Sequence, residues 1–191
     1  MARPKEFEIH EVLDKAMYLF WSQGYEKTSM QELVDTMGIH RRSIYDTFGD
    51  KHALFIQALQ RYQSLQSKRL QQLVEKQVPV TDIIRMFLET TIDNPELPKG
   101  CLMVNSGVEL GTLDPEVSAL VEGGYTQTEQ CLLDLLVAGQ VSGEIQSDLD
   151  AEGLAHYFMN AWLGLRTTVK TAVNQQKLTD IINTTLSILH K

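Results

Sequence analysis

The chain has 191 residues, of which 43% are hydrophobic and 22% are charged, and its formal net charge at pH 7 is −8. This composition is typical of a soluble globular protein, and no apolar run approaches the roughly 20 residues that span a bilayer. The acidity argues against indiscriminate nucleic-acid binding but allows specific binding through a local basic face.

The N-terminal stretch, MARPKEFEIH, lacks the apolar core of a signal peptide, so we do not expect export. From Ile9 to Phe20, apolar side chains recur at intervals of three and four residues, which predicts one face of a helix. Gly24 follows and can end this helix in a left-handed cap.

Two short helices joined by a tight turn are predicted next. Ser29 and Glu32 form the capping box that opens the first of them, and Gly38 ends it. Residues 40–47 predict the second. Two helices joined in this way are a candidate helix-turn-helix, whose second helix enters the major groove and presents its N-terminal residues to the bases.

The predicted start of that second helix is basic. Arginine is the usual bidentate reader of guanine, and the free N–H groups of a helix N-terminus suit phosphate oxygens. Helix-turn-helix geometry alone is weak evidence, and Tyr45 is also a candidate core residue. On this reasoning the candidate DNA contacts are Thr28, Ser29, His40, Arg41, Arg42, Ser43, Tyr45 and Lys51.

The rest of the chain also has helical patterns and no convincing strand. Asp50 can cap a long helix, and Asp114-Pro115-Glu116 combines a cap, a first-position proline and an acidic first turn. We therefore expect an all-α fold with about nine helices. Beyond the first three, they are expected at residues 50–76, 80–93, 101–111, 114–139, 151–172 and 178–190.

Residues 20–55, FWSQGYEKTSMQELVDTMGIHRRSIYDTFGDKHALF, resemble the DNA-binding domain of TetR-family transcriptional regulators. The shared pattern is an aromatic residue, G-[YF]-x-x-[TS]-[ST], a Gly-apolar turn, [LI]-Y-x-x-F, and a [DS]-K-x-x-L helix start. The matching residues are Phe20, Gly24, Tyr25, Thr28, Ser29, Gly38, Ile39, Ile44, Tyr45, Phe48, Lys51 and Leu54.

The resemblance implies two domains: a three-helix DNA-binding domain over residues 1–50, and a helical bundle for ligand binding and dimerisation over residues 51–191. It implies a sequence-specific regulator, and it implies a repressor because repression is the common role in the family. Such a protein binds a palindromic operator as a homodimer and is released by a small-molecule or redox signal. His40 and Arg41-Arg42 depart from the family's usual Ser or Thr and Lys-Gly or Arg-Gly. We infer an operator particular to this protein, with guanine at the positions that these arginines reach.

The resemblance also implies that the last two helices pair with those of a second copy as a four-helix bundle. The alternative is that their apolar faces close the core of a single chain. Because the last helix has much apolar surface for a chain terminus, we expect the dimer. The expected contact residues are Leu154, Phe158, Leu165, Ile182, Leu186 and Leu189.

An effector pocket in the C-terminal bundle is a further implication of the resemblance. Aromatic and methionine side chains give an adaptable apolar lining, although each is alternatively a core residue. The candidates are Phe87, Met103, Tyr125, Phe158, Met159 and Trp162. Glu109 or Glu129 could favour a cationic effector, but exposure at the surface explains either equally well.

Cys101 lies in a Gly-Cys-Leu stretch that resembles the part of the family that senses oxidants or electrophiles. A helix N-terminus and the neighbouring Lys99 would both favour the thiolate, whose oxidation could act as a switch. The alternative is a buried structural cysteine, as we expect for Cys131. The two cysteines have no metal-ligand or disulfide spacing, which favours a reducing cytoplasm.

No Ser-His-Asp pattern, phosphate-binding glycine loop or metal-ligand cluster appears, and the five histidines are scattered. We therefore expect neither an enzyme nor a bound cofactor or metal. The expected partners are double-stranded operator DNA, a second copy of the chain and a small-molecule effector, with no membrane. The rival interpretation is a helical protein-interaction module, which would lack salt-dependent, sequence-selective DNA binding.

Overall fold

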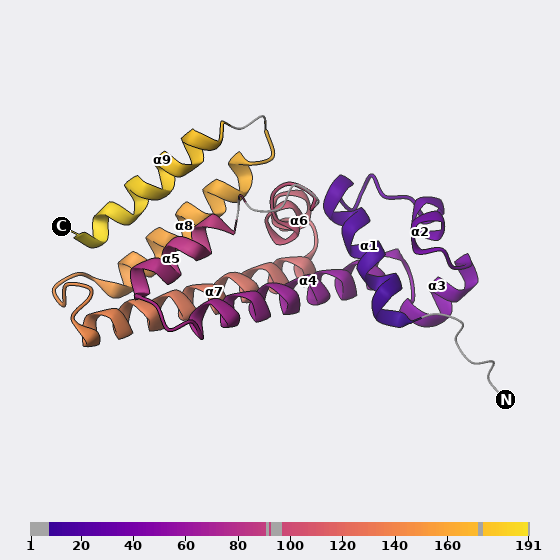
Figure 1. Cartoon of the computed structure of the whole chain (residues 1–191). Helices are drawn as coiled ribbons and strands as arrows, with labels where there is room; N and C mark the ends of the chain where they lie inside the picture. The colour runs from indigo at the N-terminus through magenta and orange to yellow at the C-terminus, as the bar shows by residue number, and fades with distance from the viewer. Residues whose placement is uncertain (1–7, 91, 93–96, 172–173, 191) are drawn as a thin grey trace. The chain divides into compact units, whose positions relative to one another are not determined.

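A computed structural model describes residues 8–90, 92, 97–171 and 174–190. This part of the chain forms nine α-helices and one short 3₁₀ helix, without a strand, which confirms the all-α prediction (Figure 1). The helices are α1 (Ile9–Gln23), α2 (Met30–Met37), α3 (Arg41–Phe48), α4 (Lys51–Val74), α5 (Val80–Glu89), α6 (Leu102–Leu110), α7 (Pro115–Ser142), α8 (Ala151–Thr168) and α9 (Gln175–Leu186), with η1 (Ser187–His190) after them.

The helix boundaries follow local signals in the sequence. Ser29 Oγ accepts the Glu32 backbone N–H at 3.2 Å, and the Glu32 carboxylate accepts the Ser29 N–H at 2.8 Å, so the predicted capping box is present. Gly38 ends α2 with a left-handed φ of +72°. The expected helix 80–93 is shorter, because α5 ends at Glu89, and its positions 91 and 93 lie outside the described residues.

The helices form two compact units that do not follow chain order. Met1–Leu65 and Cys101–Val121 belong to the first unit, and Gln66–Gly100 and Glu122–Lys191 belong to the second. The first unit therefore combines the three N-terminal helices with α6, which comes from the middle of the chain. None of the helices in the described part of the chain has both the length and the apolar character of a membrane span.

Aromatic side chains build the core of the first unit. Phe20 meets Phe55 edge-on with ring centroids 4.9 Å apart, and Trp21 meets Tyr62 in the same way at 5.0 Å. Each such pair adds about 0.5–1.5 kcal/mol beyond the area that it buries. These contacts join α1 to the first half of α4.

In the second unit, α9 packs on α5 and α8 (Figure 1). The apolar residues expected to contact a second copy are all 6% exposed or less in the single chain: Leu154, Phe158, Leu165, Ile182, Leu186 and Leu189. The expectation for these six side chains is corrected, because the faces of α8, α9 and η1 that carry them are covered by the same chain. They have almost no surface to offer a second copy.

Candidate nucleic-acid interface

Helix α3 has one buried side and one exposed side. Ile44 is fully buried and Phe48 is 3% exposed, and these two side chains fix the helix on the first unit. His40 is the N-cap residue with an extended backbone, and its imidazole makes no capping hydrogen bond. The first turn of α3 therefore lacks the side-chain cap that Ser or Thr would supply at this position.

The exposed side of α3 carries two arginines with weak internal partners. The Arg42 Nε lies 3.6 Å from the Asp46 carboxylate, and the two side chains are 92% and 68% exposed. An ion pair so exposed contributes about 1 kcal/mol at most. The Arg41 guanidinium lies 5.9 Å from the Tyr45 ring centroid, at the outer limit of a cation–π contact. Both guanidinium groups can exchange these partners for a DNA base or phosphate.

Lys51 begins α4 and has a closer partner within the chain. Its ammonium lies 4.3 Å from the Tyr25 ring centroid, over the face of the ring. Asp50 caps the same helix, with its Oδ1 accepting the Ala53 N–H at 2.8 Å. Burial raises the pKa of Tyr25 above its ordinary value, and nearby carboxylates, first Glu26, raise it further. The cation at this helix start is therefore stabilised by a neutral aromatic ring without needing an external anion.

Thr28 and Ser29 are engaged inside the turn before α2. Thr28 is fully buried, and its hydroxyl donates to the Gly24 carbonyl at 2.6 Å and accepts from the Gln23 amide at 3.2 Å. The Ser29 hydroxyl is exposed and donates to the Glu32 carboxylate at 2.7 Å. The hydrogen bonds from the backbone and hydroxyl of Ser29 lower the pKa of Glu32. Thr28, unlike the exposed candidates, has no surface with which to contact a phosphate.

A carboxylate that the sequence did not single out for this site holds the turn between α1 and α2. Glu109 of α6 accepts the backbone N–H of Tyr25 at 3.0 Å and that of Glu26 at 2.8 Å. Gly24 has φ +88°, and a Cβ there would lie 2.8 Å from a Glu109 oxygen. The resemblance marked Gly24 and Tyr25 as matching positions, but no local pattern could have named their partner in α6.

A second link joins the segment after α6 to the start of α4. His52 Nε2 lies 2.6 Å from Asp114 Oδ2, while Asp114 Oδ1 accepts the Val117 N–H at 3.1 Å and the Glu116 N–H at 3.0 Å. These partners lower the pKa of Asp114, the Val117 N–H most of all. The turn before α2 and the first turn of α4, on either side of α3, are thus both tied to the α6–α7 region.

The candidate effector residues are distributed over both units. Five of them belong to the second unit, and one of these five, Tyr125, is half-buried. The other four are each 7% exposed or less: Phe87, Phe158, Met159 and Trp162. The rings of Phe87 and Trp162 stack with centroids 5.3 Å apart. Met103 is buried in the first unit. The structure therefore brings Phe87 and Trp162 together but assigns Met103 to a different compact unit.

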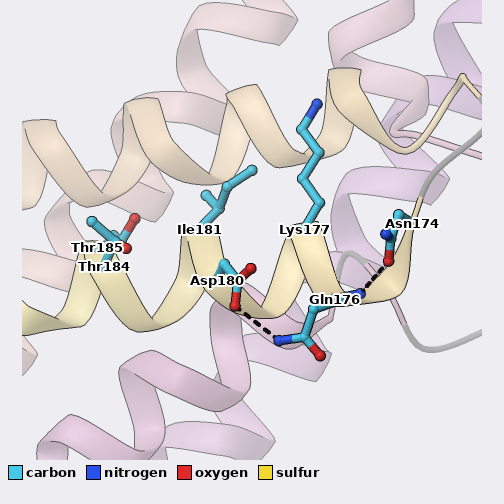
Figure 2. Close-up of a pocket in the computed structure, with 7 residues that line it drawn as sticks. All are labelled: Asn174, Gln176, Lys177, Asp180, Ile181, Thr184 and Thr185. Atoms are coloured by element: carbon cyan, nitrogen blue, oxygen red, sulfur yellow. Dashed lines mark hydrogen bonds between the residues drawn. The ribbon is translucent and has the colours of Figure 1, made fainter.

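An open hollow of about 430 Å³ runs along α9, and none of these candidates is among the residues that line it (Figure 2). Six of the seven residues that line it are of polar types, and the seventh is Ile181: Asn174, Gln176, Lys177, Asp180, Ile181, Thr184 and Thr185. The Gln176 amide donates to the Asp180 carboxylate at 2.8 Å, so part of this polar lining is paired along the helix. The shape suits contact with another surface better than it suits enclosure of a small molecule.

The two cysteines lie in different surroundings. Cys101 is the N-cap residue of α6, as predicted, but it is only 1% exposed and its thiol makes no capping hydrogen bond. Cys131 is half-buried, and burial raises the pKa of its thiol. Within the described residues, no three His, Cys, Asp or Glu side chains form a group that could hold a metal ion.

Comparison with known proteins matches nearly the whole chain. Residues 12–58 match the family described as bacterial regulatory proteins of the tetR family, and residues 80–185 match the tetracyclin repressor-like C-terminal domain. An uncharacterised helix-turn-helix transcriptional regulator of Bacillus subtilis, YezE, is 32% identical over 99% of this chain and 100% of its own length.

The Escherichia coli repressor ComR is 29% identical over 97% of this chain and 90% of its own length. A solved structure of CifR, a TetR-family regulator with substituted cysteines in complex with a 26-base-pair operator, superposes with a TM-score of 0.83. That comparison has 25% identity and covers 98% of this chain and 100% of CifR. The similarity to these regulators therefore extends through both units.

Proposed function

The chain belongs to the TetR family of DNA-binding transcriptional regulators, and we propose that it is a repressor that binds a palindromic operator as a homodimer. The observation that carries this proposal is α3, whose inner side is fixed by Ile44 and Phe48 and whose outer side carries Arg41 and Arg42. ComR is a named repressor, and CifR was solved on operator DNA, which supports the same role for this chain.

In this proposal, Arg41 and Arg42 reach base edges in the major groove, and His40, Ser43 and Tyr45 contact the DNA around them. Lys51 adds a phosphate contact, made by the same ammonium that lies over the Tyr25 ring. Thr28 is left out of the contact set because it is buried. In this proposal, residues 1–50 bind DNA, and residues 51–191 bind the effector and form the dimer.

The homodimer is proposed to use the outer faces of α8 and α9 rather than their buried apolar faces. On α8, Tyr157 is 41% exposed, and a Cβ on Gly164 would meet nothing within 4 Å, so a second helix can approach there. On α9, the hollow that Ile181 helps to line offers a second open surface to the other copy. Two copies would then present two α3 helices to half-sites about 34–36 Å apart, or a multiple of that spacing.

Release from DNA is proposed to follow binding of a small molecule in the second unit, where Phe87 and Trp162 stack. A thiol switch at Cys101 is a second candidate, favoured by the position of this residue at the start of α6, the helix that carries Glu109. Oxidation of a buried thiol at that helix start would require α6 to shift. The Cys101→Ser variant separates the two signals, because it should abolish release by an oxidant only.

Selection of bound sequences from a random DNA pool tests the proposed function. A palindromic motif, bound by two copies of the chain and lost as salt rises, is the expected result. Absence of any enriched sequence would contradict DNA reading and favour a helical interaction module. An activator rather than a repressor would be revealed by the effect of deleting the gene on transcription beside the selected sites.

A further inference from the structure

A buried arginine in the second unit has no acidic partner among the described residues. Arg166 of α8 is 6% exposed. Its Nη1 donates to the Gly100 carbonyl at 3.3 Å and its Nη2 donates to the Thr90 hydroxyl at 3.2 Å, while its Nε has no partner in the described part of the chain. None of the ion pairs among the described residues includes Arg166. An arginine is rarely so buried unless an anion pairs with it, because its charge loses hydration.

The neutral oxygens near Arg166 compensate its charge poorly. Both hydrogen bonds are at the long end of the normal range. The Thr90 hydroxyl donates to the Phe87 carbonyl at 2.6 Å, which leaves its oxygen as a neutral acceptor for Arg166. The indole N–H of Trp162 reaches the same hydroxyl only at 3.5 Å. Two N–H donors, Arg166 Nε and Trp162 Nε1, are thus left with no acceptor or a weak one.

Flat apolar surface adjoins these donors. The guanidinium carbon of Arg166 lies 4.8 Å from the Trp162 ring centroid, and the Trp162 ring stacks on Phe87 with an interplanar angle of 15°. Guanidinium and carboxylate are planar groups that pair through two parallel hydrogen bonds. Phe87 is 4% exposed and Trp162 is 7% exposed, so the surroundings of the guanidinium are apolar and favour an anion with an apolar group over an inorganic anion.

We propose that Arg166, Trp162, Thr90 and Phe87 form the binding site for the carboxylate group of a small apolar organic acid. The carboxylate accepts from the Arg166 guanidinium and the Trp162 indole, and the apolar part of the acid packs on the two rings. This proposal rests on the proposed function and names the chemical class of its effector. It replaces the cationic effector considered for Glu109, whose carboxylate is occupied by two backbone N–H groups.

Binding is measured on the full chain without DNA, by tryptophan fluorescence and thermal unfolding at constant ionic strength. The probes are sodium benzoate and sodium hexanoate, each compared with its neutral amide, benzamide or hexanamide. We expect at least one carboxylate to bind about tenfold or more tightly than its amide and to raise the melting temperature. Arg166→Met should remove this preference. The control Arg85→Met, which removes a half-exposed arginine from the same unit, should retain it.

The rival explanation is that Arg166 pairs with an acidic residue of its own chain, Asp93 or Glu96, both outside the described residues. Without a ligand, Arg166→Met should keep or raise the melting temperature, because methionine removes an uncompensated buried charge. A clear drop in the melting temperature of Arg166→Met, matched by the Asp93→Asn/Glu96→Gln double variant, would overturn the proposal. So would equal binding of acid and amide.

DNA binding is measured separately, by the selection of bound sequences from a random pool. If the chain selects no operator but prefers carboxylates through Arg166, the proposed function fails while the site holds. If it selects an operator and shows no carboxylate preference, the site fails while the proposed function holds.

Discussion

Glu109 and Tyr25 are 84 residues apart in sequence, yet the Glu109 carboxylate accepts the backbone N–H of Tyr25 at 3.0 Å. The other carboxylate oxygen takes the N–H of Glu26 at 2.8 Å, so one side chain of α6 satisfies two donors of the turn that precedes α2. Hydrogen bonds to a charged group are the stronger kind. A movement of α6 would therefore displace the turn before α2 through these two hydrogen bonds.

Replacing Glu109 should loosen that turn. Glu109→Gln retains one oxygen acceptor and should lower the free energy of unfolding by about 1 kcal/mol, and Glu109→Ala by about 2 kcal/mol. Backbone amide hydrogen exchange at Tyr25 and Glu26 should accelerate in both variants, and operator affinity should fall. The control is Glu116→Gln, which removes an exposed carboxylate from the same unit. Unchanged exchange at Tyr25 and Glu26 would rule out this role for Glu109.

Gly24 should be intolerant of a side chain for two separable reasons. Its φ of +88° is strained for any L-residue, and a Cβ would lie 2.8 Å from a Glu109 oxygen. Gly24→Ala should cost about 1–3 kcal/mol of unfolding free energy, part of which should disappear in a Glu109→Ala background.

Gly38→Ala is the matched control for Gly24→Ala. Gly38 has a φ of +72°, and a Cβ added to it would meet nothing within 4 Å, so its cost should come from backbone strain alone. That cost should be the same with and without Glu109. Equal costs of Gly24→Ala in the two backgrounds would contradict the steric contact with Glu109.

Asp114 should contribute to the loss of stability in acid. Its pKa is lowered in the folded chain from the ordinary 3.8, chiefly by the Val117 N–H and then by His52. The contribution is therefore present above the unfolded-state pKa and is lost as the pH falls through the lower folded-state value. Urea unfolding across this acid range should depend less on pH in Asp114→Asn. The exposed Asp148→Asn should behave as the unsubstituted chain, and an identical pH dependence in both variants would count against the assignment.

Lys51 should act on all DNA sequences alike. Lys51→Ala should weaken operator and non-specific duplexes by similar factors and should lower the slope of log K against log salt concentration by about one. The comparison variant is Lys68→Ala, at an exposed position of α4. A slope unchanged by Lys51→Ala would mean that the ammonium serves only the contact with the Tyr25 ring.

Local signals in the sequence were sufficient for much of the fold. The Ser29–Glu32 capping box, the end of α2 at Gly38 and the Asp114 cap all stand where the pattern predicted them, because each depends on residues within one turn. Apolar periodicity also indicated that Ile182 would be buried, but it could not identify the surface that buries it. Burial by the same chain and burial by a second copy leave the same pattern in a sequence.

The unpredicted contacts join distant parts of the chain. No spacing rule connects Glu109 with the turn at Tyr25, and both residues have other plausible surface roles. Arg166 carried a weak signal, since it is an arginine that follows Trp162 and Leu165 on an otherwise apolar face. Its burial beside the neutral oxygens of Thr90 and Gly100 could not be predicted from the sequence, because both residues are far from it in the chain.

The central claim is that Arg41 and Arg42 of α3 read the operator, and the most direct measurement repeats the random-pool selection with Arg41→Ala and Arg42→Ala. We predict that each variant loses about 1–3 kcal/mol of operator binding and relaxes the base preference at particular half-site positions, while Lys51→Ala keeps every preference. A motif and an affinity that are unchanged in both arginine variants would contradict the claim.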